Sequence, residues 1–211
     1  MIKGNLEKAE KPTLSDLLRQ IFKQPLELVG RTLYRWGVTP NALTVIGFIG
    51  TCLGALFVAI GKLEIGGVLI LMMGGFDALD GAVARAGGNS STFGAFIDSV
   101  IDRFIEMVIY AGLVWYFLAV GENLGVILAV FALGGSVLVS YARARAQSLG
   151  AETKIGFLTR FERMVVIGPS ILFRVPFWGV LIVAVFANIT AVQRIVHVWQ
   201  QMRETEELTR P

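Results

Sequence analysis

The chain has 211 residues, of which 55% are apolar and only 17% charged, and its mean hydropathy is +0.66. A water-soluble domain carries about 25% charged residues, so the composition excludes that class, a disordered chain and a disulfide scaffold. The formal net charge of +3 is too small to indicate nucleic-acid binding. Cys52 is the only cysteine and His197 the only histidine, so neither an intrachain disulfide nor a His/Cys zinc site is expected.

Residues 1–40 differ from the rest because they carry seven Lys and Arg residues and no long apolar run. Apolar residues recur at helical spacing from Leu14 to Phe22, and the pattern resumes from Leu26 to Trp36. Pro25 is expected to break or kink the helix between the two runs. The pattern predicts a basic amphipathic helix lying on the membrane surface.

From residue 41 onward, six apolar stretches each offer about 18 or more residues, enough for a helix to cross a ~30 Å hydrocarbon core. The stretches cover residues 41–60, 65–86, 92–119, 125–147, 157–174 and 177–199. The sequence therefore predicts an all-α integral membrane domain over residues 41–199. Residues 1–40 precede it as a juxtamembrane segment, and residues 200–211 follow it as a short tail.

The distribution of basic residues predicts the orientation of the six helices. Sixteen of the 19 Lys and Arg residues fall on the side that both termini would share, and only Lys62 and Arg174 fall on the other side. Basic residues near membrane helices favour the cytoplasmic side. Both termini are therefore expected in the cytoplasm, in a multi-pass protein of the cell membrane.

Four aspartates interrupt the second and third apolar stretches. An insertion scale assigns about 2.5–3.5 kcal/mol to each at the centre of a membrane helix, so four cost on the order of 10 kcal/mol. Asp77 and Asp80 are spaced i,i+3 and Asp98 and Asp102 are spaced i,i+4, which places each pair on one helix face. Because residues 87–91 form a short, turn-rich connection, the four carboxylates are expected to converge. Oxygen-only ligands suit Mg²⁺ or Mn²⁺.

Other residues near the aspartates allow two interpretations. Glu106, one turn past Asp102, either orients a ligand or pairs with the neighbourhood of Arg103. The nearby glycines either let a bulky ligand approach the backbone or serve close helix packing. These glycines are Gly74, Gly75, Gly81 and Gly94.

The aspartates belong to a longer pattern that resembles a known family. Residues 77–102 read Asp77-x2-Asp80-Gly81-x2-Ala84-Arg85-x8-Gly94-x3-Asp98-x3-Asp102. This pattern is similar in full to the signature of the CDP-alcohol phosphotransferases, integral-membrane enzymes that make phospholipid headgroups. The six predicted membrane helices also resemble the fold of that family, so the likeness covers nearly the whole chain.

The resemblance implies a transfer reaction at a CDP-linked lipid such as CDP-diacylglycerol. An alcohol hydroxyl attacks the β-phosphorus, and CMP leaves. Asp77, Asp80 and Asp98 are implied to hold two Mg²⁺ ions, with Mn²⁺ as the alternative, and Asp102 is implied to bind metal and to act as the general base. An aspartate with a pKa of about 4 is a poor base for an alcohol, so the metal must lower the pKa of the hydroxyl. A homodimer is also implied.

The resemblance further implies which residues contact the CDP-lipid. They come from the signature and from the Thr39-Pro40-x3-Thr44 turn at the start of the first membrane helix, and they are Asn41, Thr44, Gly81, Arg85, Ser91 and Gly94. Arg85 suits phosphate as a fixed positive charge, although it also suits a membrane-boundary anchor. The Thr-Pro turn also suits an ordinary helix start.

A second pattern bears on the acceptor alcohol. Residues 140–146 read Ser-Tyr-Ala-Arg-Ala-Arg-Ala, and Gly156-x3-Arg160-x-Glu162-Arg163 follows. The arrangement resembles the prokaryotic phosphatidylinositol-phosphate synthases, except that those have lysine at the place of Arg143. It implies inositol 1-phosphate as acceptor, with its phosphate held by Ser140, Arg143, Arg160 and Arg163. Glycerol 3-phosphate, the acceptor of phosphatidylglycerophosphate synthases, is the alternative, and cytoplasmic loops also hold basic residues whatever the substrate.

Two other classes of membrane protein remain to be weighed. A cation transporter also buries carboxylates in membrane helices, but the outer halves of these helices are almost wholly apolar and offer no pathway for an ion. A purely structural membrane protein gives no reason to bury four aspartates. Release of CMP from a CDP-lipid, measured with and without Mg²⁺, separates both from the enzyme.

Overall fold

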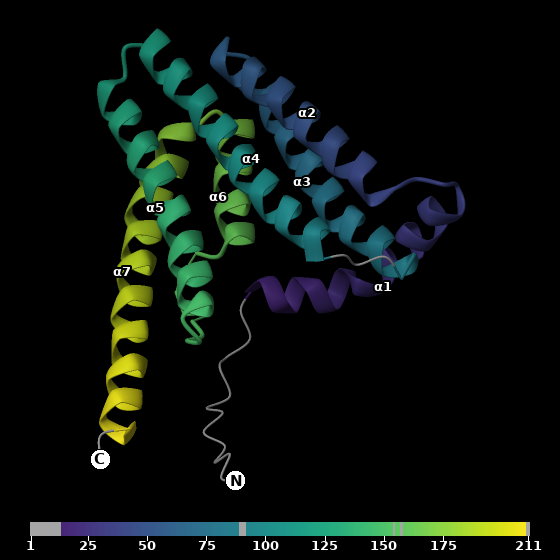
Figure 1. The fold of residues 1–211 in the computed structure, drawn as a ribbon. Helices are drawn as coiled ribbons and strands as arrows, with labels where there is room; N and C mark the ends of the chain where they lie inside the picture. Colours follow the sequence, from purple (N-terminus) through teal and green to yellow (C-terminus); the bar gives the residue numbers. More distant parts are fainter. Residues whose placement is uncertain (1–13, 89–91, 154, 157, 210–211) are drawn as a thin grey trace.

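The computed structural model describes residues 14–88, 92–153, 155–156 and 158–209, and side chains are described there except at residues 14–23, 77 and 206–209. All regular structure within these residues is helical (Figure 1). The helices are α1 (Leu14–Arg35), α2 (Pro40–Ala59), α3 (Leu63–Ala86), α4 (Thr92–Ala119), α5 (Asn123–Ser148), α6 (Arg160–Leu172) and α7 (Pro176–Thr209).

The six apolar stretches predicted from the sequence each form a helix, from α2 to α7. In the described part of the chain, four of these helices are long and apolar enough to cross a membrane: α2, α3, α5 and α7. Helix α4 has the length, but charged residues crowd its first half. Helix α6 has 13 residues, or about 20 Å at 1.5 Å per residue, which is shorter than the ~30 Å hydrocarbon core. The protein is therefore a multi-pass helical membrane protein with four candidate spans in its described residues.

Local chemistry explains why α6 is shorter than the predicted stretch 157–174. Thr159 has an extended backbone and begins the helix as its N-cap, and its backbone N–H donates to the Glu162 carboxylate at 2.6 Å. At the other end Arg174 has a φ of 61°, which the helix cannot accommodate, and Pro176 begins the next helix. Hydropathy reflects neither the N-cap at Thr159 nor the turn at Arg174. The apolar stretch is therefore longer than the helix.

The helices form two groups that α4 and α6 join. Helices α2 and α3 pack together on one side, α5 and α7 pack together on the other, α4 packs against α2 and α5, and α6 packs against α3 and α7 (Figure 1). Within the described residues, α3 and α4 each pack on α2 rather than closely on each other, although the connection between them is short. The buried core joins both groups through Ile109 and Leu113 of α4 and Ile167 and Ile171 of α6.

Glycines bring the helix backbones close together. A Cβ atom at Gly112 of α4 would lie 2.6 Å from the carbonyl oxygen of Ala55 in α2, and one at Gly67 of α3 would lie 2.6 Å from the backbone nitrogen of Leu172 in α6. No side chain fits at such distances. Small residues at these crossings allow the tight packing that membrane helices need when hydrophobic burial between them gives no driving force.

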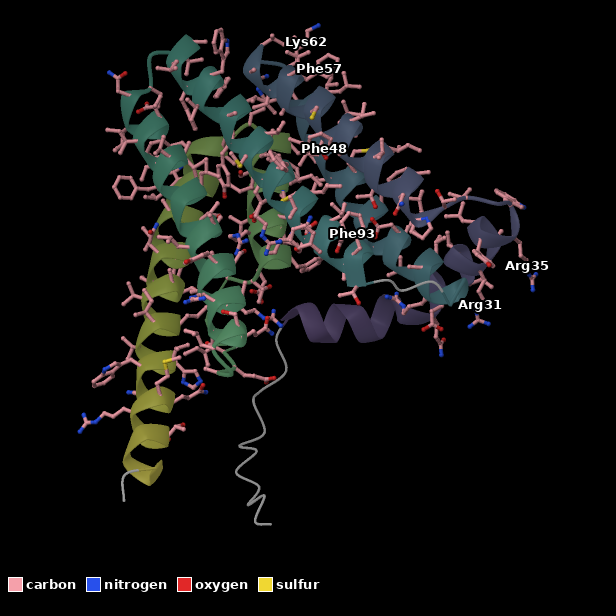
Figure 2. All side chains as sticks on the ribbon, viewed as in Figure 1. Arg31, Arg35, Phe48, Phe57, Lys62 and Phe93 are labelled. Atoms are coloured by element: carbon pink, nitrogen blue, oxygen red, sulfur yellow. The ribbon has the colours of Figure 1, made fainter. Side chains whose placement is uncertain are left out.

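Helix α1 runs across one end of the bundle, where α3 and α5 end and α2, α4 and α6 begin (Figure 1). We call this the α1 end. Pro25 lies inside α1 without ending it, so the predicted break is absent. Gly30 of α1 packs against Ala82 of α3. Figure 2 shows Arg31 and Arg35 projecting near this end and Lys62 at the opposite end.

Candidate active site

The start of α2 faces the end of α3 at the α1 end. Thr39 has an extended backbone, its side chain accepts a hydrogen bond from the Ala42 amide at 3.3 Å, and Pro40 occupies the first turn, so the predicted helix start is confirmed. One turn later, Thr44 Oγ1 donates to Asp80 Oδ2 at 2.7 Å. Because Asp80 is buried, this bond to a charged acceptor orients the carboxylate.

The surface of α3 around Asp80 is open. A Cβ atom at Gly74 or Gly75 would meet no protein atom within 4 Å, and one at Gly81 would meet only Arg85 Nη1, at 3.3 Å. Packing within the described part of one chain therefore does not explain these three glycines. Arg85 is exposed and lies over Gly81. This face leaves room for a ligand beside a positive charge.

Asp102 of α4 meets Arg160 of α6 across the α1 end. Arg160 Nη2 lies 2.6 Å from Asp102 Oδ1, and Arg103 Nη1 lies 3.4 Å from Asp102 Oδ2. The Asp102 side chain is largely buried, whereas that of Arg160 keeps 24% of its surface exposed. Asp98 lies one turn before Asp102 on α4 and is half-buried. An acidic group and a partly exposed guanidinium thus stand side by side.

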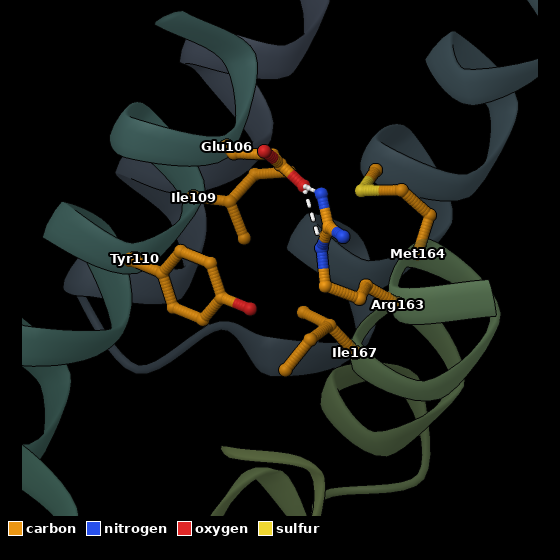
Figure 3. Close-up of a pocket in the computed structure, with 6 residues that line it drawn as sticks. All are labelled: Glu106, Ile109, Tyr110, Arg163, Met164 and Ile167. Atoms are coloured by element: carbon orange, nitrogen blue, oxygen red, sulfur yellow. Dashed lines mark hydrogen bonds and ion pairs between the residues drawn. The ribbon is translucent and has the colours of Figure 1, made fainter. Parts of the chain in front are cut away.

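A second ion pair lies one turn deeper. Arg163 Nη2 and Nε lie 2.6 Å and 3.0 Å from Glu106 Oε1, and Arg163 Nη1 donates to the Leu158 carbonyl at 3.2 Å (Figure 3). The side chains of Arg163 and Glu106 are 1% and 2% exposed. Tyr110 and apolar side chains surround the pair. Glu106 was expected either to orient a ligand or to pair near Arg103 on its own helix. In the structure it pairs with Arg163 of α6 instead.

Further arginines gather beside this pair. Arg194 of α7 is 4% exposed and donates to the Val139 carbonyl of α5 at 2.7 Å and to the Ile155 carbonyl at 3.0 Å. Arg143 of α5 is exposed, and both it and Arg163 act electrostatically on Arg194. Ser140 is half-buried, and its hydroxyl donates to the Ser136 carbonyl one turn earlier at 3.2 Å. Arg143, Arg163 and Arg194 therefore lie close to one another although they come from three helices, and Glu106 offsets the charge of Arg163.

The structure brings the residues of the site together in part. Asp80, Gly81, Arg85 and Thr44 share one region, and Asp102 and Arg160 share another. Asn41 is exposed at the start of α2, and Gly94 is half-buried near the start of α4. The side chain of Asp77 and the whole of Ser91 lie outside the described residues.

The donor set fits a divalent cation by its chemistry. Asp80, Asp98 and Asp102 supply only oxygen, which hard divalent ions prefer, and two of these carboxylates are buried. Among the described side chains, which omit Asp77, no three His, Cys, Asp or Glu residues already gather at metal-binding distance. Convergence of all four carboxylates is therefore untested by this geometry.

The sequence analysis counted Arg194 only among the basic residues of the cytoplasmic side. It did not predict the buried contacts that Arg194 makes. The available signal was its position inside an apolar stretch, because a charge there needs buried partners. The partners themselves are carbonyl groups of distant residues, which no sequence pattern marks.

Comparisons with known proteins connect this geometry to a family. The family model described as CDP-alcohol phosphatidyltransferase matches residues 37–200. An archaetidylinositol phosphate synthase of Pyrococcus horikoshii is 40% identical over 179 residues, covering 84% of this chain and 93% of that protein. A phosphatidylinositol phosphate synthase of Mycobacterium tuberculosis is 34% identical over 195 residues, covering 87% and 89%.

Solved structures agree with these relatives. The crystal structure of the M. tuberculosis phosphatidylinositol phosphate synthase with CDP-DAG bound matches with a TM-score of 0.76 at 31% identity, covering 82% of this chain and 93% of that one. The same enzyme in complex with manganese and citrate matches with a TM-score of 0.75 at 33% identity, covering 82% and 88%. Since the family model spans most of the chain and the relatives cover more than two thirds of it, the protein belongs to the CDP-alcohol phosphatidyltransferase family.

Proposed function

We propose that the protein transfers a phosphatidyl group from CDP-diacylglycerol to inositol 1-phosphate and releases CMP. The observation that carries this proposal is the contact between Arg160 Nη2 and Asp102 Oδ1 at 2.6 Å. It places a guanidinium suited to an acceptor phosphate next to the carboxylate suited to deprotonate the acceptor hydroxyl. The relatives support the acceptor, because the archaeal and the bacterial enzyme are both named for inositol phosphate products.

The CDP-lipid is assigned to the open face of α3 and the start of α2. Asn41, Thr44, Gly81, Arg85, Ser91 and Gly94 are its proposed contacts. The space over Gly81 and the exposed guanidinium of Arg85 support this assignment, since a pyrophosphate needs backbone access and positive charge. The match to a relative's structure with CDP-DAG bound supports the same donor.

Divalent metal is assigned to Asp77, Asp80, Asp98 and Asp102, as two Mg²⁺ ions or, alternatively, Mn²⁺. A relative crystallised with manganese supports a divalent ion. When bound, such ions neutralise the pyrophosphate and lower the pKa of the acceptor hydroxyl. The hydrogen bond from Thr44 then serves to keep the Asp80 carboxylate in one orientation.

At the acceptor, Asp102 takes the proton from the inositol hydroxyl as that oxygen attacks the β-phosphorus. The new P–O bond forms while the bond to CMP breaks, and CMP keeps the electron pair. Arg160 binds the acceptor phosphate. Arg143 and Ser140, which lie on neighbouring turns of α5, are assigned further contacts with that phosphate. The guanidiniums of Arg143 and Arg194, which lie near each other, support an anionic acceptor in this region.

The membrane arrangement is part of the proposal. The six helices from α2 to α7 carry the chain through the membrane within a domain of residues 41–199, with α6 covering only part of the hydrocarbon core, α1 lies along the cytoplasmic surface, and both termini are cytoplasmic. The separation of Lys62 from the arginines of the α1 end supports this orientation. The active site then faces the cytoplasm of the cell membrane, and two copies of the chain form a homodimer.

Release of CMP tests the function directly. The purified protein is given CDP-diacylglycerol with Mg²⁺ or EDTA, and in parallel with inositol 1-phosphate, glycerol 3-phosphate, inositol or serine. Mg²⁺-dependent release of CMP with inositol 1-phosphate, and slower release with the other three, is the expected result. Faster release with glycerol 3-phosphate would make the protein a phosphatidylglycerophosphate synthase instead.

A further inference from the structure

Two glycines follow the last residue of α3, and the backbone requires only one of them. Gly88 has a φ of 65°, a conformation that other residues rarely adopt. Gly87 has a φ of −85° and a ψ of −5°, which most residues tolerate. A Cβ atom at Gly87 would instead lie 2.6 Å from Tyr34 Cε2 and 3.2 Å from both Tyr34 Cδ2 and Cζ. The missing side chain at Gly87 therefore makes room for the Tyr34 ring.

Tyr34 lies in the last turn of α1, on the face that packs against α3. Gly30, one turn earlier on the same face, packs against the buried Ala82 of α3. Within the described residues α1 packs mainly on α3. Its two contacts fall on either side of Arg85, because Ala82 precedes Arg85 by three residues and Gly87 follows it by two. Helix α1 thus braces the turn of α3 that carries Arg85.

The position of Arg85 depends on such a brace. Arg85 lies in the last turn of α3, and helix ends fray unless other contacts hold them. Its guanidinium is exposed and lies over Gly81. Paired hydrogen bonds from a guanidinium to a phosphate need close geometry, and a displacement of about 1 Å can cost about 10²-fold in rate. A shift of the last turn of α3 would therefore weaken the grip of Arg85 on a phosphate.

We propose that Tyr34 is a positioning residue for the CDP-lipid: its ring packs on Gly87, holds the last turn of α3 and so presents Arg85 to the pyrophosphate. Tyr34 acts through Arg85 and does not itself bind the lipid. The atoms nearest to Gly87 are ring carbons, so the hydroxyl group is not needed. The inference rests on the proposed function, because Arg85 derives its role from it.

The first test measures KM for CDP-diacylglycerol and for inositol 1-phosphate, each at saturation of the other. Tyr34→Phe keeps the ring carbons and should match the wild type within twofold. Tyr34→Ala removes the ring, and Gly87→Ala places a methyl group where the ring lies. Both should raise the KM for CDP-diacylglycerol at least fivefold and leave the acceptor KM within twofold. Because both changes break one contact, the double variant should be no worse than Tyr34→Ala alone.

Trp36→Ala is the matched control. It removes an aromatic ring two residues further along, but Trp36 keeps 77% of its surface exposed, so neither KM should change. If Tyr34→Phe loses as much as Tyr34→Ala, the hydroxyl group acts and the inference is wrong. An unchanged KM for CDP-diacylglycerol in Tyr34→Ala also overturns it. Equal rises of both KM values, with a lowered melting temperature, would reduce the contact to a general structural role and overturn the inference as well.

Binding of CDP, measured by isothermal titration with Mg²⁺ present, tests the route through Arg85 and needs no turnover. CDP carries the pyrophosphate without acyl chains. Its binding should weaken at least fivefold in Tyr34→Ala and in Arg85→Gln, and the double variant Tyr34→Ala/Arg85→Gln should bind no more weakly than Arg85→Gln alone.

The titration also separates this inference from the proposed function. The expected pattern of CDP binding supports the role of Tyr34 even if no CMP is released in the assay, in which case only the proposed reaction fails. Three results overturn the inference while leaving the proposed reaction to its own assay: equal binding by the wild type and Tyr34→Ala, a further loss in the double variant, or no binding by the wild type.

Discussion

Asp102 has a buried carboxylate whose two oxygens face arginines from different helices, with Arg160 Nη2 at 2.6 Å and Arg103 Nη1 at 3.4 Å. A carboxylate is a weak proton acceptor for an alcohol, so a base of this kind needs a partner that makes the hydroxyl more acidic. The arrangement therefore suits a base that works together with a metal ion.

Asp102→Asn keeps the shape of the side chain and one oxygen for Arg160 but removes the basic group. We expect kcat for CMP release to fall by about 10²–10⁴-fold, the usual contribution of general acid–base catalysis. Binding of CDP-diacylglycerol, measured by titration, should persist. Glu122→Gln, an exposed carboxylate-to-amide change before α5, is the control and should turn over normally. A fully active Asp102→Asn variant would remove Asp102 from the role of base.

Thr44→Val removes the hydroxyl that orients Asp80 while keeping a β-branched side chain of similar size. Loss of a hydrogen bond to a metal ligand typically costs 10–100-fold in metal affinity or activity. We therefore expect the Mg²⁺ concentration for half-maximal CMP release to rise about tenfold. Thr51→Val is the matched control on the same helix, since Thr51 Oγ1 donates only to the Gly47 carbonyl at 2.8 Å. Equal effects of the two variants would contradict a specific role for Thr44.

The sequence identifies individual residues of the site better than it identifies their partners. The spacing of the aspartates and the Thr-Pro turn mark Asp80 and Thr44, whose contact the structure then shows. Glu106 and Arg163 lie 57 residues apart. Helical periodicity says which face each occupies, but the pairing depends on how α4 and α6 are placed in space.

At the level of elements, hydropathy predicts that each of α2 to α7 exists, because burying apolar residues in lipid demands long helices. It predicts the ends of α6 poorly, since Thr159 and Arg174 determine those ends through the backbone. Of the break or kink expected at Pro25, the break does not occur, because α1 continues through that residue. The position where a helix ends depends on single residues, whereas the formation of the helix depends on the summed hydropathy of many residues.

The crossing of α1 over α3 offers a test of what α1 contributes. A Cβ at Gly30 would lie 2.8 Å from the backbone carbon of Ala82, in the helix that carries Asp80 and Arg85. Gly30→Ala should therefore push α1 away and destabilise the protein by about 1–3 kcal/mol, the usual cost of overpacking. Thermal unfolding in detergent measures the loss.

Gly134→Ala is the matched control for Gly30→Ala. Gly134 lies inside α5, where an added Cβ meets nothing within 4 Å. This variant should keep or raise the melting temperature, because alanine favours a helix by about 1 kcal/mol over glycine. Equal melting temperatures for the two variants would show that α1 yields freely and does not brace α3.

For the whole molecule, the arrangement in two helical groups places the start of α2, the end of α3, the starts of α4 and α6 and the end of α5 together at the α1 end. The described residues assigned to the proposed site lie in those halves of their helices that are nearer to the α1 end. Local sequence patterns supply the residues, but only the alternating direction of the helices brings them to one end.

Labelling with a membrane-impermeant maleimide tests the orientation of the molecule. In a Cys52→Ser background, a cysteine at Lys62 should react in intact cells, whereas one at Gln147 should react only after permeabilisation. The reason is that Lys62 lies between α2 and α3 and Gln147 lies near the end of α5, at opposite ends of the bundle. The reverse result would place the α1 end outside the cell.

Helix α6 is too short to reach from one lipid surface to the other. Its length therefore affects the connection that precedes it. Its 13 residues rise about 20 Å, so about 10 Å of a ~30 Å hydrocarbon core is left to the connections at its two ends. The preceding connection would then carry irregular backbone to a depth where lipid offers no hydrogen bonds. Arg163 and Arg194 donate to the Leu158 and Ile155 carbonyls of that connection. The two guanidiniums thus supply hydrogen bonds that water would otherwise give, so this connection can lie at lipid depth, where the proposed water-soluble acceptor would meet the headgroup of a membrane-bound donor.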